Sequence, residues 1–567
     1  MSVPERERGQ QLEWATHEVK NQPPPLVGHD LFSQDAALVE GFRREGAAWA
    51  EEHLRSIGRK AGSAEAQAWG ALANELPPRL RTHDRYGHRV DEVDYHPAYH
   101  ELMKFSVGAG LSAFAPKDAR PGTHVVRAAG FFVFGQVEAG HGCPISMTHA
   151  AVPALRVQPE LAAEWEPRFT SRTYDFGLRP AAKKAGALCG MAMTEKQGGS
   201  DVRANTTRAV PVSQSGPGRE YLLTGHKWFC SAPMCDAFLV LAQAPGGLSC
   251  FLLPRVLPDG TRNRMHLMRL KDKLGNRSNA SSEVEFHGAL AWMVGEEGRG
   301  VRTIIEMVNF TRLDCVIGSA SIMRQGVTQA IHHATYRTAF GRELVNQPLM
   351  RNVLADLALE AEAATTLFLR LAAACDRADK DEGEALFKRI ALAVSKYWVC
   401  KRTPAHAAEA LECLGGNGYV EDSGMPRLYR EAPVNSIWEG SGNVNALDVL
   451  RAVSKQPEVL GVLLGEIEKA KGGNAHLDRA VDRLKHEVSS FEDIEARSRR
   501  LVEQLAVALQ ASLLVRHAPA YMSDAFCASR LGGEWGAAFG TLSPKVDFVS
   551  IIERSRIALP GVRASLA

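Results

Sequence analysis

The sequence lacks long apolar runs and a strong charge of one sign. No apolar stretch approaches the roughly 20 residues that a transmembrane helix needs. The charged start at 1–11 has no apolar centre of the kind found in secretion signals. The 567 residues carry a net charge of only +2, so no overall field indicates a nucleic-acid or membrane partner. We therefore expect a cytoplasmic protein that has no membrane partner.

Disulfide, metal and Rossmann patterns are also missing. The 10 cysteines are scattered without a C-x-x-C pair, and the 19 histidines do not cluster at ligand spacing. No G-x-G-x-x-G follows a strand-like run, which argues against a doubly wound dinucleotide domain. The chain is 45% apolar and 23% charged, the balance of a large globular protein. We expect free, mostly buried thiols and no metal site.

The apolar pattern changes along the chain. The first segment reads as helical, with one apolar face around 125–133. Short apolar runs bounded by Gly, Pro and Asp then indicate strands. Helical spacing follows, and a last segment has leucines at four-residue intervals from 501 to 513. The sequence predicts a mainly α chain with a central β domain, divided into a helical domain at 1–184, a β domain at 185–295, a helical domain at 296–453 and a C-terminal helical extension at 454–567.

Two segments far apart in the sequence carry the strongest chemical signal. AMTEKQGGSD at 192–201 offers hydroxyls and closely approachable backbone, which suit the edge of an aromatic heterocycle and a phosphate. IWEGSGN at 437–443 places one carboxylate, Glu439, in a Gly-rich turn after an aromatic residue. Taken alone, the first string is more typical of a polar β-turn and the second of an exposed turn.

Three further strings accompany them: GHKWFCS at 225–231, RTAFG at 337–341 with Gln347 following, and ECLGGNGYVEDSGMPRLYRE at 412–431. In this order, the strings resemble the signatures of the acyl-CoA dehydrogenase family. The resemblance implies that family's fold, which is a helical domain, a β-barrel and a four-helix bundle. It also implies FAD as cofactor and an acyl-CoA thioester as substrate.

The resemblance assigns roles to single residues. Phe229 is expected to pack on the flavin ring and Ser231 to bond it, while Trp228 should point the other way along its strand. Arg337, Phe340 and Gln347 are expected to serve the FAD of an adjacent protomer. Thr194, Ser200 and Ser231 are expected to contact substrate. The full set of expected cofactor contacts is Met191, Ala192, Met193, Thr194, Glu195, Lys196, Gln197, Gly198, Gly199, Ser200, Phe229, Cys230, Ser231, Arg337, Phe340, Gln347, Gly415, Gly416, Ile437, Trp438, Gly440, Ser441, Gly442 and Asn443.

Glu439 is the expected catalytic base. In the family, a carboxylate removes the α-proton of the thioester while a hydride leaves the β-carbon for the flavin. Exclusion of water would raise the pKa of such a carboxylate toward working pH. Some branches carry the base on an earlier helix, just before an Arg, but the pair at that place here is Thr311-Arg312. No carboxylate therefore competes with Glu439.

Strings such as NQPPPL at 21–26, VEAGHGCPISMTHA at 137–150 and LKDKLGNRSNAS at 270–281 resemble one branch of the family, which is induced by DNA alkylation. This resemblance implies a homotetramer with weak activity on branched short-chain thioesters of the isovaleryl-CoA type. It also implies binding of double-stranded DNA through the C-terminal region.

The residues themselves give weaker support for DNA binding. From residue 497 onward there are 9 Lys and Arg against 5 Asp and Glu. No helix-turn-helix or zinc-finger pattern appears, so any binding should be largely sequence-nonspecific. The candidate DNA contacts are Arg451, Arg497, Arg499, Arg500, Arg554 and Arg556.

Two alternatives to this function stay open: a catabolic short- or branched-chain acyl-CoA dehydrogenase without a DNA role, and a flavin-dependent oxidase or monooxygenase.

Overall fold

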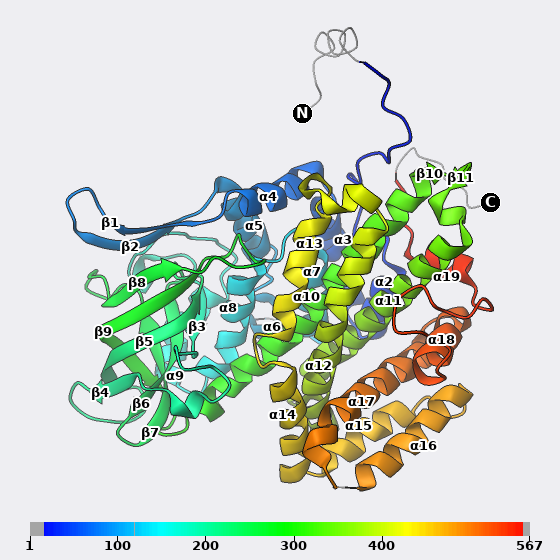
Figure 1. Cartoon of the computed structure of the whole chain (residues 1–567). Helices are drawn as coiled ribbons and strands as arrows, with labels where there is room; N and C mark the ends of the chain where they lie inside the picture. The colour runs from blue at the N-terminus through cyan, green and yellow to red at the C-terminus, as the bar shows by residue number, and fades with distance from the viewer. Residues whose placement is uncertain (1–15, 118–119, 491, 560–567) are drawn as a thin grey trace.

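A computed structural model describes residues 16–117, 120–490 and 492–559. A β-barrel lies on one side of the molecule, long helices form its middle, and the C-terminal helices pack on the far side of these (Figure 1). The segment 1–11, on which the expectation of no secretion signal depended, lies outside the described residues. The order of a helical part, a β-barrel, long helices and further C-terminal helices is the one that the sequence predicts.

Helices dominate the first part of the chain, as predicted. The predicted apolar face is that of α7, where Val125, Ala129 and Phe132 are all fully buried. The elements are α2 Ala36–Arg44, α3 Glu51–Ala61, α4 Ala64–Glu75, β1 Arg79–His83, β2 Arg89–Asp94, α5 Pro97–Gly108, α6 Phe114–Lys117, α7 Thr123–Gly135, α8 Gly142–Leu155 and α9 Pro159–Phe169.

The β1–β2 hairpin is a feature that the sequence did not predict. Its strands alternate mostly polar side chains, so they carry no apolar run. The turn is built locally: Asp84 Oδ1 accepts the backbone N–H groups of Tyr86 and His88, and Gly87 has a left-handed φ of +84°. Such an exposed ribbon has no apolar periodicity by which it could be detected.

The barrel closes because β7 pairs with both β9 and β6. The sheet order is β3-β6-β4-β5-β9-β7, with β8 added on β9. β6 and β7 are apolar at nearly every position because they face buried surroundings on both sides. The strands are β3 Cys189–Ala192, β4 Arg208–Pro211, β5 Glu220–Ser231, β6 Ala237–Ala244, β7 Gly247–Pro254, β8 Met265–Leu270 and β9 Ser281–Val294.

Three long helices, α10, α11 and α12, pack against one another and against α7 and α8. The elements of this part are α10 Gly300–Tyr336, β10 Thr338–Ala339, β11 Arg342–Glu343, α11 Pro348–Arg377, α12 Glu382–Glu412, α13 Met425–Glu431 and α14 Gly442–Lys455. The extension adds α15 Glu458–Glu468, α16 Ala475–Ser489, α17 Ile494–His517, α18 Ala520–Phe526 and α19 Phe548–Ser555. The leucine series predicted for the extension is buried in α17.

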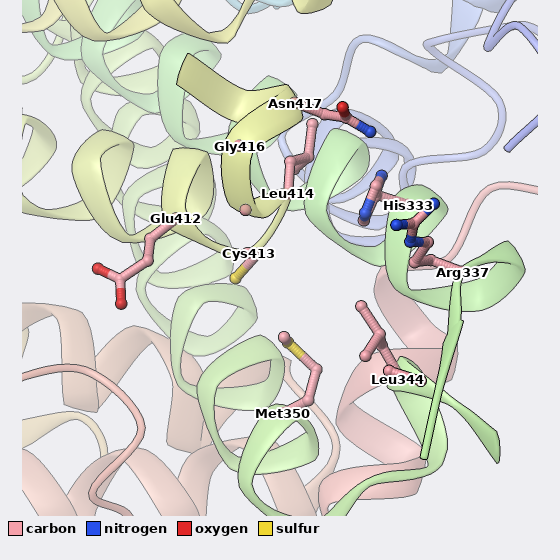
Figure 2. A pocket seen from close by; sticks show the side chains of 11 residues that line it. His333, Arg337, Leu344, Met350, Glu412, Cys413, Leu414, Gly416 and Asn417 are labelled. Carbon is pink, nitrogen blue, oxygen red and sulfur yellow. The ribbon is translucent and has the colours of Figure 1, made fainter. Parts of the chain in front are cut away.

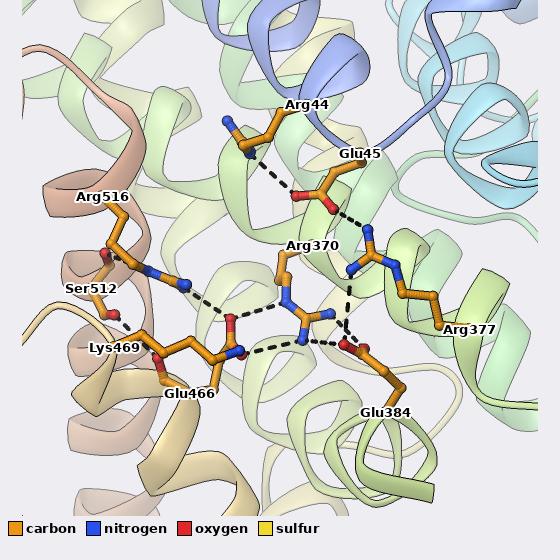
Figure 3. Close-up of polar contacts among 9 residues, drawn as sticks. All are labelled: Arg44, Glu45, Arg370, Arg377, Glu384, Glu466, Lys469, Ser512 and Arg516. Atoms are coloured by element: carbon orange, nitrogen blue, oxygen red, sulfur yellow. Dashed lines mark hydrogen bonds and ion pairs between the residues drawn. The ribbon is translucent and has the colours of Figure 1, made fainter. Parts of the chain in front are cut away.

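A buried ion network fixes the extension to the long helices (Figure 3). Glu466 of α15 accepts from Arg370 Nε of α11 at 3.0 Å and from Arg516 of α17 at 2.9 Å. Arg370 also pairs with Glu384 of α12 at 2.8 Å. The side chains of Glu466 and Arg370 are only 4% and 7% exposed, so each charge depends on its partners.

Glu466→Gln is expected to weaken docking of the extension by about 3–5 kcal/mol, because the two arginines lose a buried counter-charge. Urea unfolding should show a lower midpoint, and amide hydrogen exchange in α17 should become faster. Glu468→Gln on the same helix is the matched control, because Glu468 pairs with Lys485 near the surface and such a pair contributes about 0–1 kcal/mol. Equal urea midpoints and equal hydrogen exchange in α17 for the two variants would contradict this account of the network.

The described residues can be searched for membrane-spanning helices, metal-binding groups and disulfides. No helix there is both long and apolar enough to cross a bilayer. Within the same ranges, His, Cys, Asp and Glu side chains form no group of three or more that could hold a metal ion. All 10 cysteines are free, and each except Cys143 is buried. The domain boundaries at 184, 295 and 453 stay predictions.

Candidate functional site

The loop after β3 is held by a carboxylate that points inward. Glu195 is fully buried, with Oε1 2.8 Å from Lys227 Nζ and Oε2 2.7 Å from the N–H of Thr206. Burial favours a raised pKa, but Lys227 and the hydrogen bonds from Thr206 and Thr207 outweigh it and hold the pKa of Glu195 well below its usual range. The Glu195 side chain is thus occupied within the loop, while 196–200 lie exposed.

The end of β5 presents an aromatic ring and a hydroxyl. Phe229 is 48% exposed, and Ser231 Oγ lies 3.1 Å from Ser281 Oγ. Cys230 is fully buried in the barrel core, so its side chain faces away from Phe229. Ser231 therefore lies at the barrel surface with hydrogen-bonding capacity that the Ser281 contact does not exhaust.

The expectation that Trp228 points away from Phe229 is wrong. The pairing of β5 with β9 shifts register between Lys227 and Cys230, which marks a β-bulge. At a bulge the usual alternation of side chains is interrupted. Lys271 Nζ lies 3.1 Å from the ring centroid of Trp228 and 4.8 Å from that of Phe229, so one cation contacts both rings.

Glu439 lies in the turn before α14 and accepts a hydrogen bond from Thr311 Oγ1 of α10, at 2.7 Å from its Oε2. Its backbone is in the left-handed region at φ +57°. Such a conformation costs a non-glycine residue about 1–3 kcal/mol and persists only where the surroundings enforce it. Contacts from outside the turn must therefore stabilise the left-handed backbone at Glu439.

Lys396 and Arg312 donate hydrogen bonds to the backbone around Glu439. Lys396 Nζ of α12, with 1% of the residue exposed, donates to the carbonyls of Trp438 at 2.7 Å and Gly440 at 2.6 Å. Arg312 Nε donates to the carbonyl of Glu439 at 3.1 Å. Three successive carbonyls are thus fixed by buried positive charge, which provides the external hold that the left-handed turn requires.

The Cys143 thiol of α8 is hydrogen-bonded with Ser231 and feels the charge of Glu439. Desolvation raises the pKa of the Cys143 thiol to about 12; the charge of Lys273 and a hydrogen bond with Ser231 oppose this rise, and the negative charge of Glu439 adds to it. The predicted flavin hydroxyl and the predicted base thus both act on one thiol of α8.

A hollow of about 500 Å³, which we call the Arg337 hollow, lies between the end of α10 and the turn after α12 (Figure 2). Arg337 lines one side, and Gly415 and Gly416 line the other. A Cβ atom at either glycine would meet no atom within 4 Å, so the backbone is open to a ligand. The carboxylate of Glu412 points away from the other labelled side chains in Figure 2.

The donor set of this hollow fits part of a dinucleotide. A guanidinium and closely approachable backbone suit a diphosphate, and the apolar side chains of Leu344, Met350 and Leu414 suit a heterocycle. Gln347 donates to the carbonyl of Ala339 at 2.9 Å and so supports the turn beside Arg337. Phe340 is 98% exposed.

The remaining predicted residues lie around the turn at 439. Ile437 is 64% exposed, and Trp438 Nε1 donates to Asn435 Oδ1 at 3.1 Å. Ser441 is the N-cap of α14, whose first residues are Gly442 and Asn443. Free N–H groups at such a helix start favour an anionic ligand.

Comparisons with known proteins agree with this geometry. Three family models match in order: Adaptive response protein AidB N-terminal domain over 21–176, acyl-CoA dehydrogenase middle domain over 190–289, and acyl-CoA dehydrogenase C-terminal domain over 298–454. The AidB protein of Escherichia coli (strain K12) is 48% identical over 91% of this chain and 94% of its own. The chain belongs to the acyl-CoA dehydrogenase family.

Within this family it is similar to the AidB proteins, and its cofactor is FAD. Caenorhabditis elegans ACDH-11 in complex with C11-CoA superposes with a TM-score of 0.82 at 27% identity, covering 96% of this chain and 94% of that one. The apo-form of Bd2924 superposes with a TM-score of 0.81 at 28% identity, covering 89% and 100%. Both likenesses extend well beyond the three matched domains into the C-terminal extension.

The predicted DNA contacts divide into two groups. Arg451 and Arg500 are exposed, whereas Arg499 is exposed but bonded to Tyr397 Oη at 3.2 Å. Arg497 pairs with Glu487 at 2.9 Å. The first group therefore keeps exposed positive charge at Arg451 and Arg500, and Arg500 Nη2 lies 3.8 Å from Glu487 Oε1.

The second group corrects the sequence-based prediction. The Arg554 side chain is 9% exposed and pairs with Glu40 and Glu362 at 2.6 and 2.8 Å. The side chain of Arg556 is 12% exposed and pairs with Glu553 at 2.8 Å. Arg554 thus helps to dock α19 on α2 and α11, whereas Arg556 pairs with Glu553 of α19 itself, and the two do not form a free basic patch. The sequence could not show this, because Glu40 and Glu362 lie far away along the chain.

Proposed function

We propose that the protein dehydrogenates an acyl-CoA thioester with Glu439 as the base that removes the α-proton. The observation that carries this proposal is the position of Glu439, bonded to Thr311 and held through three neighbouring carbonyls by Lys396 and Arg312. FAD, when bound, supplies the acceptor for the β-hydride. Phe229 and Ser231 would hold the flavin, and Arg337 with the Gly415 turn would hold the diphosphate half.

The surroundings of Glu439 suit this role. Burial raises its pKa above the ordinary range, while the Thr311 hydrogen bond and the charges of Lys396 and Arg312 lower it by less. A base of raised pKa accepts a carbon-bound proton more readily than an exposed carboxylate does. Burial thus strengthens the base, while Thr311, Lys396 and Arg312 orient it and lower its pKa by less than burial raises it.

The rate of flavin reduction is expected to rise with pH. Only the ionised carboxylate can accept the proton, and its pKa is raised, so the acidic limb should lie above the ~4.3 of a free glutamate. Anaerobic stopped-flow with isovaleryl-CoA over a range of pH measures this limb. A rate that is already at its maximum near the free value would contradict the assignment.

For the substrate, we propose a branched short-chain thioester of the isovaleryl-CoA type, turned over weakly. The similarity to AidB supports this proposal. The same similarity supports a homotetramer and a cytoplasmic location. Phe340, Leu349 and Tyr419 are 98%, 84% and 84% exposed near the Arg337 hollow, as expected of surface that a second protomer covers. Sedimentation equilibrium tests the tetramer.

We also propose nonspecific binding of duplex DNA in the response to DNA alkylation. Arg451 and Arg500 provide exposed positive charge on the extension, and four copies would multiply it. Mobility-shift titrations at two salt concentrations test the proposal, and affinity should fall as salt rises. Arg451→Ala and Arg500→Ala should weaken binding, while Arg85→Ala, an equal charge change in the β1–β2 turn, should not.

A second candidate is a catabolic acyl-CoA dehydrogenase without a DNA role. The complete arrangement around Glu439 favours it, because residual activity would not require so many fixed contacts. Rapid turnover with an electron acceptor and no duplex affinity at low salt would establish this second candidate over the first.

A further inference from the structure

The segment 21–24, which we call the N-terminal strap, is hydrogen-bonded to Arg337 and Asn417, two residues that line the Arg337 hollow. It contacts both sides of that hollow. Arg337 Nη1 donates to the carbonyl of Asn21 at 2.7 Å, and Asn417 Nδ2 donates to Gln22 Oε1 at 3.3 Å. His332 Nε2 lies 2.7 Å from the carbonyl of Pro24. Figure 2 shows part of the N-terminal region, in faint blue, beside the labelled Asn417.

Asn21 is bonded to the strand that follows Arg337. Its Oδ1 accepts from the N–H of Thr338 at 2.7 Å and from Thr338 Oγ1 at 2.8 Å, and its Nδ2 donates to the Thr338 carbonyl at 2.9 Å. Asn21 has a left-handed φ of +60°, which asparagine tolerates better than most residues. One side chain therefore satisfies both backbone groups of Thr338, directly beside the arginine.

The contact from the strap leaves the positive charge of Arg337 available for a ligand. The partner of its guanidinium is a neutral carbonyl, so the side chain is oriented while its charge is not cancelled. A planar guanidinium has five donors, and the carbonyl takes one of them. The others remain for an anion in the hollow. A carboxylate partner would instead compete with a diphosphate for the same charge.

We propose that Asn21 is a positioning residue for cofactor binding: the strap holds Arg337 in the orientation that binds the diphosphate of FAD. This inference rests on the proposed role of the Arg337 hollow. Preorganisation reduces the ordering cost of binding, so its loss appears as weaker affinity. The strap thus makes the start of the chain part of a site whose other residues lie more than three hundred positions later.

The test is FAD affinity measured on deflavinated protein by quenching of FAD fluorescence. Asn21→Ala is expected to weaken FAD binding about tenfold. Asn21→Gly, which keeps the left-handed backbone accessible, should weaken it similarly, because the side-chain bonds to Thr338 are lost in both. Asn474→Ala, which removes an asparagine side chain that accepts a backbone N–H at the start of α16 in the extension, should leave FAD affinity unchanged.

A double-mutant cycle separates positioning from a general loss of structure. If Asn21 acts through Arg337, the Asn21→Ala change should add little in an Arg337→Ala background. Additive losses, or an unchanged affinity in Asn21→Ala and Asn21→Gly, would overturn the inference. If Arg337→Ala itself binds FAD as the wild type does, the assignment of the hollow fails first, and the strap proposal fails with it.

Discussion

Glu439→Gln is expected to retain FAD and thioester binding but to lose reduction of the flavin by the thioester. The amide cannot accept the α-proton, and a positioned general base contributes about 10²–10⁴ in rate. Gln has nearly the same shape, and its carbonyl can still accept the hydrogen bond from Thr311. Anaerobic stopped-flow with isovaleryl-CoA, followed at the flavin absorbance, measures the loss.

The matched control is Glu458→Gln, an exposed carboxylate at the start of α15 that should leave the rate unchanged. Flavin reduction by the thioester at the wild-type rate in Glu439→Gln would contradict the assignment of the base. Because Thr311-Arg312 supplies no carboxylate, the position on α10 used in other branches could not replace Glu439.

The second large effect is expected from Lys396→Met. Met fills much of the same volume but removes the ammonium that bonds the carbonyls of Trp438 and Gly440. Without it, the left-handed turn at Glu439 loses its support. A displacement of about 1 Å at a reacting group can cost on the order of 10²-fold in rate. We expect a loss of this size in the rate constant for flavin reduction.

A pH profile shows that the loss comes from the site and not from general unfolding. Lys396 lowers the pKa of Glu439 against the effect of burial, so its removal should move the acidic limb to higher pH. Lys104→Met, an exposed change on α5, is the control and should move neither rate nor limb. A Lys396→Met protein with an unshifted acidic limb and an unchanged rate would show that the bonds from Lys396 to the carbonyls of Trp438 and Gly440 do not position the base.

The sequence predicted what is encoded locally. The turn at 437–443 and the loop at 192–201 are contiguous strings, so their glycines, hydroxyls and carboxylate could be read together. The apolar faces of α7 and α17 likewise follow from spacing alone. The fold class and the family therefore emerged before any geometry was known.

Contacts between distant elements could not be predicted. Lys396 reads as one more helical lysine, and only the packing of α12 on the turn at 439 shows that it bonds two carbonyls. Thr311 was noted only because it is not a carboxylate, although its hydroxyl bonds Glu439. The bulge in β5 and the burial of Arg554 were missed for the same reason.

The measurement that tests the account most directly is the visible spectrum of the freshly purified protein during anaerobic titration with isovaleryl-CoA. The account predicts a yellow protein whose flavin absorbance is lost as thioester is added, and this loss should be absent in Glu439→Gln. A colourless protein that takes up no FAD on reconstitution, or a bound flavin that stays oxidised at excess thioester, would contradict it.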